Sequence, residues 1–444
     1  MREGKAGMTT DAVAAVQEIL THDEEFLIDL TRRLVRIPTV NPKFEADAAI
    51  NREAELQREL RGVLDSIGMA TESYDVFPDR PNLTGSLPGS DARSLILCGH
   101  VDVVPVGDRA AWSVDPFGAE IKDRRLYGRG AIDMKSGVAA TVAVARAIRE
   151  AGIVLEGRLD IHAVVDEEAG GFGARDLVRR GARAAGLIVT EPTWQTVQPA
   201  EGGLEWVRVT LRGRNAHSAW RFNELYPQPD TPDRLEPGVN ALDLGVRFVQ
   251  AIQQLERDWT TRKRAHPLLP AGMNTIHPGV MVCGAGLAPN GLPQLLTNPA
   301  IVPDTAVIDF DLKFLPNETS ADIRRDFEAF VHAFAQQDSW LREHPPKVEW
   351  DLYGLHFPPL NTPVEHGLVQ ALVRSRESAG LATEIKGFVA VCDAAHYAGA
   401  GIPGVIYGAG GDGFHGKDEY VDLDSLAVVA RTLAAATLAW CGVQ

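Results

Sequence analysis

Five residues that can bind metal ions each stand at or just after the end of a separate strand-like apolar run. They are His100, Asp133, Glu168, Glu191 and His415. Histidine nitrogens and carboxylate oxygens are the usual protein ligands of zinc and related divalent ions. Two histidines together with several carboxylates most simply indicate a hydrolytic site that holds two metal ions.

A second carboxylate accompanies the first histidine. His100 follows the apolar run 94–99, and Asp102 comes two positions later. Because residues i and i+2 of an extended strand share a face, we expect the Asp102 carboxylate to hydrogen-bond the imidazole and orient it. A surface histidine and aspartate at a strand end is the plainer interpretation of this pair.

Three consecutive carboxylates, Asp166, Glu167 and Glu168, follow the apolar run 159–165. Such a run is usually a solvated acidic loop, but clustered anions at a buried strand end need cations. One of the two glutamates can bind metal while the other stays free as a general base. Asp133 taken alone is typical of a helix cap, although its two oxygens could also bridge two ions.

The elements that must position these residues alternate between strand and helix patterns as far as Glu191. Apolar runs are followed by polar turns and by amphipathic segments such as 136–151. This alternation predicts an α/β fold, a mostly parallel sheet with helices on both faces. In such a sheet the ligand crevice lies outside the carboxyl ends of the strands, where the five residues would meet.

The pattern changes after Gly203. Residues 206–212 and 306–314 alternate apolar with polar positions, as half-exposed strands do, and 240–257 and 321–334 have helical spacing. Residues 267–303, rich in Gly, Pro and Asn, read as a long connection. We therefore predict a catalytic domain formed by 1–203 and 355–444 and an inserted α+β lid and dimerisation domain at 204–354.

Composition excludes several classes of protein. The net charge of −16, without a basic stripe, argues against nucleic-acid binding. The four cysteines show no CxxC spacing, which favours reduced thiols in a cytosolic protein. The N-terminal residues lack the apolar core of a signal peptide, and no segment looks long enough to span a bilayer. We expect a cytoplasmic protein without a membrane partner.

With these motifs in view, the chain resembles the dizinc metallopeptidase family of aminoacylase, acetylornithine deacetylase, succinyl-diaminopimelate desuccinylase and glutamate carboxypeptidase. The matching motifs run from Gly99 to His415. The resemblance implies two divalent ions, zinc ahead of cobalt or manganese, bridged by Asp133. His100 and Glu191 would complete one metal site, and Glu168 and His415 the other. Glu167 would be the general base, and Asp102 would orient His100.

The resemblance extends to the predicted lid. Residues 213–219 are similar to the family's lid histidine motif, which implies that His217 stabilises the oxyanion, in relatives from a partner subunit, and that the protein is a homodimer through the lid. Relatives usually have an arginine for the substrate carboxylate where this chain has Lys313, and often an asparagine where it has Ala300. Residues 220–237 are an insertion. Lys313, Asn298 and Arg221 are the candidate substrate contacts.

These motifs predict hydrolysis of the amide C–N bond of a small molecule, with an N-acyl amino acid or a similar conjugate as the first choice. A dipeptidase or carboxypeptidase would share every metal ligand. A hydrolase of aromatic amines or amidines is a third interpretation, because the altered lid leaves room for a substrate without the usual carboxylate. A non-catalytic binding protein on an enzyme fold is the fourth.

Overall fold

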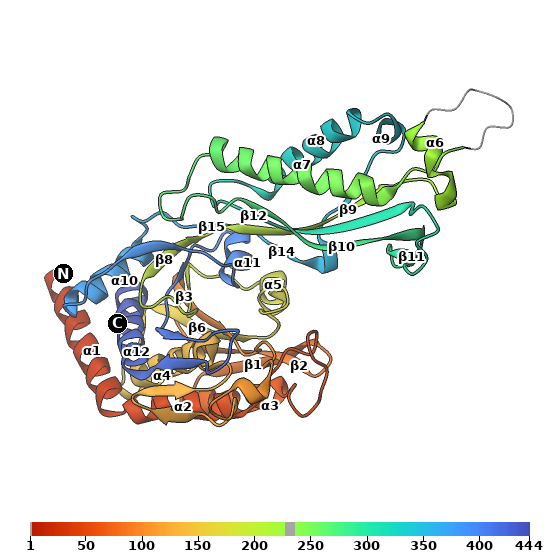
Figure 1. Ribbon diagram of the computed structural model, residues 1–444. Coiled ribbons are helices and arrows are strands. Elements are labelled where there is room, and N and C mark those ends of the chain that lie inside the picture. The colour runs from red at the N-terminus through yellow and green to blue at the C-terminus, as the bar shows by residue number, and fades with distance from the viewer. Residues whose placement is uncertain (1, 227–235) are drawn as a thin grey trace. The chain divides into compact units, whose positions relative to one another are not determined.

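The computed structural model describes residues 2–226 and 236–444 (Figure 1). The chain divides into two compact units, which we call unit 1 (Met1–Glu201 and Phe357–Gln444) and unit 2 (Gly202–His356). Unit 2 is thus an insertion in the sequence of unit 1. The boundaries expected from the sequence were 203/204 and 354/355, and those of the two units are 201/202 and 356/357.

Unit 1 is built on a mixed sheet with the strand order β1-β2-β6-β3-β7-β17-β8-β15, and β16 pairs with β8. Its four central strands, β6, β3, β7 and β17, are parallel, while β1, β2 and β15 pair antiparallel with their neighbours. The strands are β1 (Ala70–Phe77), β2 (Arg80–Leu87), β3 (Ser90–His100), β6 (Gly157–Val164), β7 (Gly186–Val189), β8 (Val197–Glu201), β15 (Leu360–Asn361), β16 (Ile385–Phe388) and β17 (Gly404–Ile406). A small second sheet joins β18 (Gly411–Asp412), β19 (Tyr420–Asp422), β5 (Arg125–Tyr127) and β4 (Glu120–Lys122).

Helices cover both faces of the central sheet, as the alternating pattern predicts. Along β3, Leu95 and Leu97 enter one hydrophobic cluster while Ile96 and Cys98 enter another, as the two-residue period of a strand requires. The first cluster includes residues of α1, α2, α3, α4, α10 and α12, and the second includes residues of α5 and α11. These helices are α1 (Arg2–His22), α2 (Glu24–Arg36), α3 (Glu53–Ser66), α4 (Ser136–Glu150), α5 (Phe172–Arg179), α10 (Gly367–Ser378), α11 (Ala394–Gly399) and α12 (Leu423–Cys441).

One helix corrects the expectation about apolar segments. By length and composition α12 is apolar enough to cross a membrane, contrary to the sequence-based interpretation. Most of its residues are instead buried in unit 1, where it packs against α4 and α10. Its apolar surface is therefore used in the core of the α/β unit.

Unit 2 combines an antiparallel sheet with helices. The strand order is β11-β10-β12-β9-β13. Along β12, Ile308, Phe310 and Leu312 point into a core shared with helix residues such as Phe248 and Phe327. The elements are β9 (Gly203–Arg212), α6 (Phe222–Leu225), α7 (Ala241–Arg262), β10 (Thr275–Leu287), β11 (Pro293–Leu295), β12 (Thr305–Phe314), α8 (Ser320–Gln336), α9 (Ser339–Glu343) and β13 (Lys347–Glu349), with β14 (His356–Phe357) at the junction with unit 1.

The connection expected over 267–303 is wrong for much of its length, because β10 and β11 lie there. Strand β10 pairs with β12 from Thr275 to Gly284, and its register shifts between Pro278 and Val280. A proline within a strand is accommodated at such an irregularity. Pairing with β12 thus overrides the low strand propensity of the Pro and Gly residues.

Candidate metal centre

The five predicted ligands come together in unit 1 in two groups that share Asp133. His100, Asp133 and Glu191 form one group, and Asp133, Glu168 and His415 form the other, with the possible ligand atoms of each group within 4.8 Å of one another. Asp133 Oδ1 lies 3.2 Å from His100 Nε2, and Asp133 Oδ2 lies 3.3 Å from His415 Nε2. The Asp133 carboxylate therefore belongs to both groups, because each of its two oxygens lies beside the histidine of a different group.

The ring of His100 is oriented by backbone and not by the carboxylate that we predicted. Its Nδ1 lies 2.9 Å from the backbone carbonyl oxygen of Asp102, whereas the Asp102 carboxylate is 3.7 Å from that nitrogen. A carbonyl oxygen can only accept, so Nδ1 carries the proton and Nε2 keeps its lone pair toward Asp133. The hydrogen bond expected from the Asp102 side chain is thus made by the Asp102 backbone carbonyl, which fixes the tautomer of His100.

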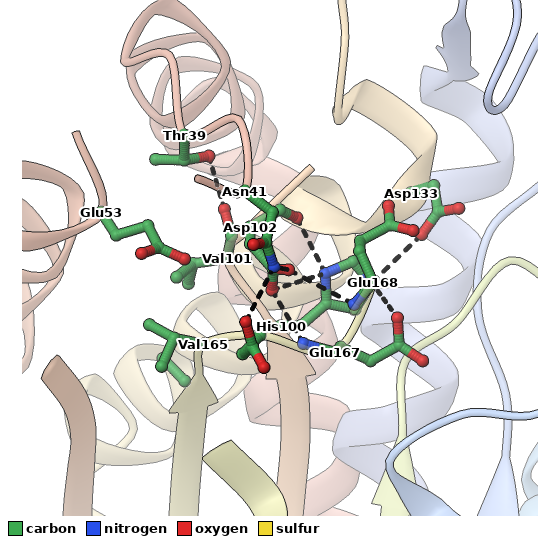
Figure 2. Close-up of polar contacts among 12 residues, drawn as sticks. Thr39, Asn41, Glu53, His100, Val101, Asp102, Asp133, Val165, Glu167 and Glu168 are labelled. Atoms are coloured by element: carbon green, nitrogen blue, oxygen red, sulfur yellow. Dashed lines mark hydrogen bonds and ion pairs between the residues drawn. The ribbon is translucent and has the colours of Figure 1, made fainter. Parts of the chain in front are cut away.

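The Asp102 carboxylate instead holds the loop that follows β6 (Figure 2). Its Oδ1 accepts the backbone N–H of Glu167 at 3.1 Å, and its Oδ2 accepts that of Glu168 at 3.3 Å. Asn41 donates to the same Oδ2 at 2.8 Å. The end of β3 and the acidic loop after β6 are thereby joined through one buried side chain.

Glu419 holds the turn that presents Asp133. Its Oε1 accepts the backbone N–H groups of Ile132 and Asp133 at 3.1 and 3.2 Å, and its other oxygen pairs with the buried Arg129. Gly130, before the turn, has φ +81°, and a Cβ there would lie 2.6 Å from Val103 Cγ1. This role of Glu419 could not be predicted from the sequence, because nothing local links Glu419 to residues nearly three hundred positions earlier.

The centre holds an excess of buried negative charge. Burial raises the pKa of Glu168 to about 7, with the Asp133 carboxylate adding to the rise, and burial raises the pKa of Glu191 as well. Hydrogen bonds with Asp133 and Glu168 raise the pKa of His415 to about 10. Burial opposes a charge on His100, but the carboxylates of Glu191 and Asp133 still raise its pKa well above the usual range.

This donor set fits two divalent cations. Acidic side chains crowded in a buried site are stable only with compensating positive charge, and histidine with carboxylate is the donor chemistry of zinc, cobalt and manganese. Glu167 stands beside the groups without belonging to either, with Oε2 3.8 Å from His100 Nε2. Burial also raises the pKa of Glu167 well above its usual range.

The remaining predicted residues belong to unit 2. His217 is exposed, and its Nδ1 accepts the backbone N–H of Ala219 at 3.1 Å, so its Nε2 carries the proton. The Asn298 side chain accepts the backbone N–H of Ala300, and Arg221 lies 3.4 Å from Asp243. An isolated β-bridge pairs His217 with Ile301, so the segment that contains His217 lies beside the segment that contains Asn298 and Ala300. Asn240 caps α7, because its side-chain oxygen accepts the backbone N–H of Leu242. Part of the 220–237 insertion, 227–235, is outside the described residues.

Lys313 does not join that group within unit 2. The Thr305 end of β12 pairs with Arg212, near His217 in sequence, whereas Lys313 pairs with Leu204 at the other end of the strand. An extended strand of this length spans roughly 27 Å. Within one copy of unit 2, Lys313 therefore lies far along β12 from the segment of His217 and Asn298, and the role of Lys313, Asn298 and Arg221 as substrate contacts stays a prediction.

A third group of possible ligands, Glu205, Asp351 and His356 in unit 2, is of another kind. Arg324 donates to both carboxylates of this group, and His356 Nδ1 lies 2.9 Å from Glu205. One guanidinium of the chain thus already pairs with both carboxylates of this group.

Comparison with known proteins agrees with this geometry. Residues 96–439 match Peptidase family M20/M25/M40. The chain belongs to this family. It is 30% identical to N-formyl-4-amino-5-aminomethyl-2-methylpyrimidine deformylase of Bacillus subtilis, over 97% of this chain and 98% of the relative. A probable succinyl-diaminopimelate desuccinylase of Staphylococcus epidermidis is also 30% identical, but over 55% of each chain. The solved aminopeptidase PepT of Bacillus cereus matches with a TM-score of 0.68 at 20% identity, over 94% of this chain and 99% of PepT.

Membership of the M20 family confirms the predicted resemblance, fold class and reaction class. The protein is a metal-dependent hydrolase that acts on C–N bonds, and its family binds a pair of metal ions. The fourth interpretation, a non-catalytic binding protein on an enzyme fold, is therefore not favoured.

Proposed function

We propose that the protein hydrolyses the formamide C–N bond of N-formyl-4-amino-5-aminomethyl-2-methylpyrimidine or a close analogue. The observation that carries this proposal is the extent of the match. The Bacillus subtilis deformylase aligns over 97% of the chain, whereas the desuccinylase aligns over 55%. A formylated aminopyrimidine has no carboxylate, which agrees with a chain that lacks the usual arginine at Lys313.

In this proposal His100 and Glu191 would hold one metal ion, Glu168 and His415 would hold the second, and Asp133, which belongs to both groups, would be shared between them. When bound, such ions act as Lewis acids that polarise a carbonyl and lower the pKa of water. Zinc is the first choice of ion, with cobalt or manganese as substitutes.

Glu167 is the proposed general base. It takes a proton from the attacking water as the water oxygen bonds to the formyl carbon, and it delivers a proton to the leaving nitrogen as the C–N bond breaks. Formate and the primary amine leave. The position of Glu167 supports this role, because its carboxylate lies beside the ligand groups, only 11% exposed, but belongs to neither.

His217 is the proposed oxyanion donor, since its exposed Nε2 carries the hydrogen. We further propose that it acts across a homodimer formed through unit 2, and that the protein is cytoplasmic. The support for the dimer is the family resemblance, and the support for the location is the cysteine usage.

The test is a substrate panel measured with Zn²⁺ or Co²⁺ present. It compares the formylated aminopyrimidine with N-succinyl-diaminopimelate, N-acetyl amino acids and free dipeptides, with formate or amine release as the readout. The proposal expects kcat/KM for the formyl substrate to exceed the others by at least tenfold. Preference for the succinyl, acetyl or dipeptide substrates would contradict it and establish one of the alternative activities.

A further inference from the structure

Asn41 is a buried residue whose side chain lies beside Asp102 (Figure 2), and all the hydrogen-bonding groups of its amide have partners. Its Nδ2 donates to Asp102 Oδ2 at 2.8 Å and to Asp166 Oδ1 at 3.0 Å. Its Oδ1 accepts the backbone N–H of Lys43 at 3.0 Å. These three bonds fix which side of the amide is nitrogen, because both carboxylates need a donor.

The two carboxylates that Asn41 joins follow different strands. Asp102 comes after β3, which ends at His100, and Asp166 comes after β6 and directly precedes Glu167. Without a donor between them, two buried like charges would repel each other. The neutral amide gives one N–H to each and so sets their separation.

The backbone of Asn41 is itself held against the strand end. Asn41 N donates to Val103 O at 2.9 Å, and Val103 N donates to Thr39 O at 3.0 Å. The Thr39 hydroxyl donates to Val101 O at 2.6 Å. Asn41 therefore moves with the segment that carries Asp102, and its side chain transmits that position to Asp166.

The Asp166 carboxylate is also held by two cationic side chains. Arg80 donates to its Oδ1 at 2.7 Å, and Lys43 donates to its Oδ2 at 2.5 Å. Glu53 is paired with the same guanidinium group and holds it in place. Asp166 has φ +69°, a backbone conformation that a residue other than glycine keeps only when its surroundings hold it.

We propose that Asn41 is a positioning residue for the catalytic centre. By bridging Asp102 and Asp166 it sets the distance between the strand end that carries His100 and the loop that carries Glu167 and Glu168. This inference rests on the proposed roles of those three residues in the metal centre. Its direct consequence is a dependence of metal affinity on the Asn41 amide, whatever the substrate.

Asn51 offers a matched control. Its Nδ2 donates to the carbonyl oxygens of Val40 and Glu45 at 2.7 and 2.9 Å, and its Oδ1 accepts from Asp47 N. It thus fastens the same loop between α2 and α3 through the same kind of bonds. None of these partners is a carboxylate of the metal centre.

The experiment compares full-length wild type, Asn41→Ala and Asn51→Ala, each stripped of metal and titrated with Co²⁺. The readouts are the Kd of Co²⁺ by calorimetry, the visible absorption spectrum of bound Co²⁺, the Tm, and kcat and KM separately. We expect Asn41→Ala to weaken Co²⁺ binding about 10- to 100-fold, to change the Co²⁺ spectrum, and to lower kcat with KM within about threefold of wild type. Asn51→Ala should keep the wild-type spectrum and Co²⁺ affinity even where its Tm falls.

Wild-type Co²⁺ affinity and spectrum in Asn41→Ala would overturn the proposal, as would a loss of affinity that follows Tm equally in both variants. If Asn41→Ala does not fold, Asn41→Ser replaces it. The serine hydroxyl keeps one donor, so an intermediate Co²⁺ affinity supports the proposal and a wild-type affinity refutes it. The metal readouts use no substrate, so they decide this point even if the proposed deformylase activity is not found.

Discussion

The backbone N–H of Glu167 donates to Oδ1 of Asp102 at 3.1 Å, which ties the proposed base to the strand end that carries a proposed metal ligand. The two residues follow different strands, β6 and β3, that lie side by side in the sheet. We expected the Asp102 carboxylate to hydrogen-bond His100, but it accepts hydrogen bonds from the loop that carries Glu167. The positions of base and ligand depend on one shared anchor.

Removing that anchor should cost both stability and activity. Asp102→Ala leaves the N–H groups of Glu167 and Glu168 and the amide of Asn41 without their shared acceptor. Each unsatisfied buried group costs about 1–3 kcal/mol, and loss of such an outer partner typically lowers activity or metal affinity about 10- to 100-fold. Denaturant unfolding and steady-state kinetics measure the two effects. A stable, fully active Asp102→Ala protein would show that the anchor is not needed.

The shared ligand predicts an unequal loss of metal among variants. Asp133 addresses both ligand groups, whereas Glu191 and Glu168 each belong to one. Asp133→Ala should therefore weaken binding at both sites, and Glu191→Ala should weaken binding mainly at one. Metal content per chain after dialysis against a weak chelator checks this, with two ions expected for wild type. Equal losses in the two variants would argue against bridging by Asp133.

Much of this centre could be predicted because its ligands follow apolar strands, and parallel strands bring their carboxyl ends together. The positions of His100, Glu168 and Glu191 follow from that rule alone. Asn41 could not be found in this way, since an asparagine before a proline is typical of any turn. Its partners lie 61 and 125 residues away in the sequence, and contacts over such separations cannot be predicted from the residues around Asn41.

The errors have equally local causes. Strand β10 contains proline and glycine, which have low strand propensity, so its sequence predicts a connection. Pairing with β12 makes this segment a strand. The spacing of His100 and Asp102 places both on one strand face, but it does not tell whether the imidazole meets the carboxylate or the carbonyl of Asp102. The position of Lys313 relative to Asn298 likewise depends on the register of β12, which places Lys313 opposite Leu204.

The Arg80 network predicts a large loss of folding stability. Arg80, Glu53 and Asp166 are all nearly inaccessible to solvent, and Arg80 is paired with both carboxylates. Removing one partner of a buried ion pair leaves an uncompensated charge and costs about 3–5 kcal/mol. Arg80→Met should therefore lower the free energy of unfolding by that amount. The matched surface variant Arg109→Ala, whose pair with Asp115 is exposed, should change it by less than about 1 kcal/mol. Similar small changes in both variants would contradict this account.

His162 predicts a pH dependence of stability. Burial lowers the pKa of its ring to about 4, and its Nδ1 shares a hydrogen bond of 2.8 Å with the Tyr397 hydroxyl. Between about pH 6.5 and pH 4 the unfolded chain binds a proton that the folded chain does not, so stability falls as the pH falls through this window. The contribution is on the order of 3 kcal/mol. Unfolding free energies at several pH values should show a shallower loss in His162→Asn, which keeps an acceptor for Tyr397. An identical acid slope in both proteins would exclude His162 as the cause.

The central claim is that this strand-end centre is a hydrolytic site in which Glu167 moves the proton. Glu167→Gln keeps the size of the side chain and removes its basicity. The measurement is kcat, with metal content and Tm of the same sample, on the best substrate that the panel identifies. We predict that kcat falls at least about 100-fold while two metal ions per chain and the wild-type Tm are retained. Turnover near the wild-type rate in a metal-loaded Glu167→Gln protein would contradict the account.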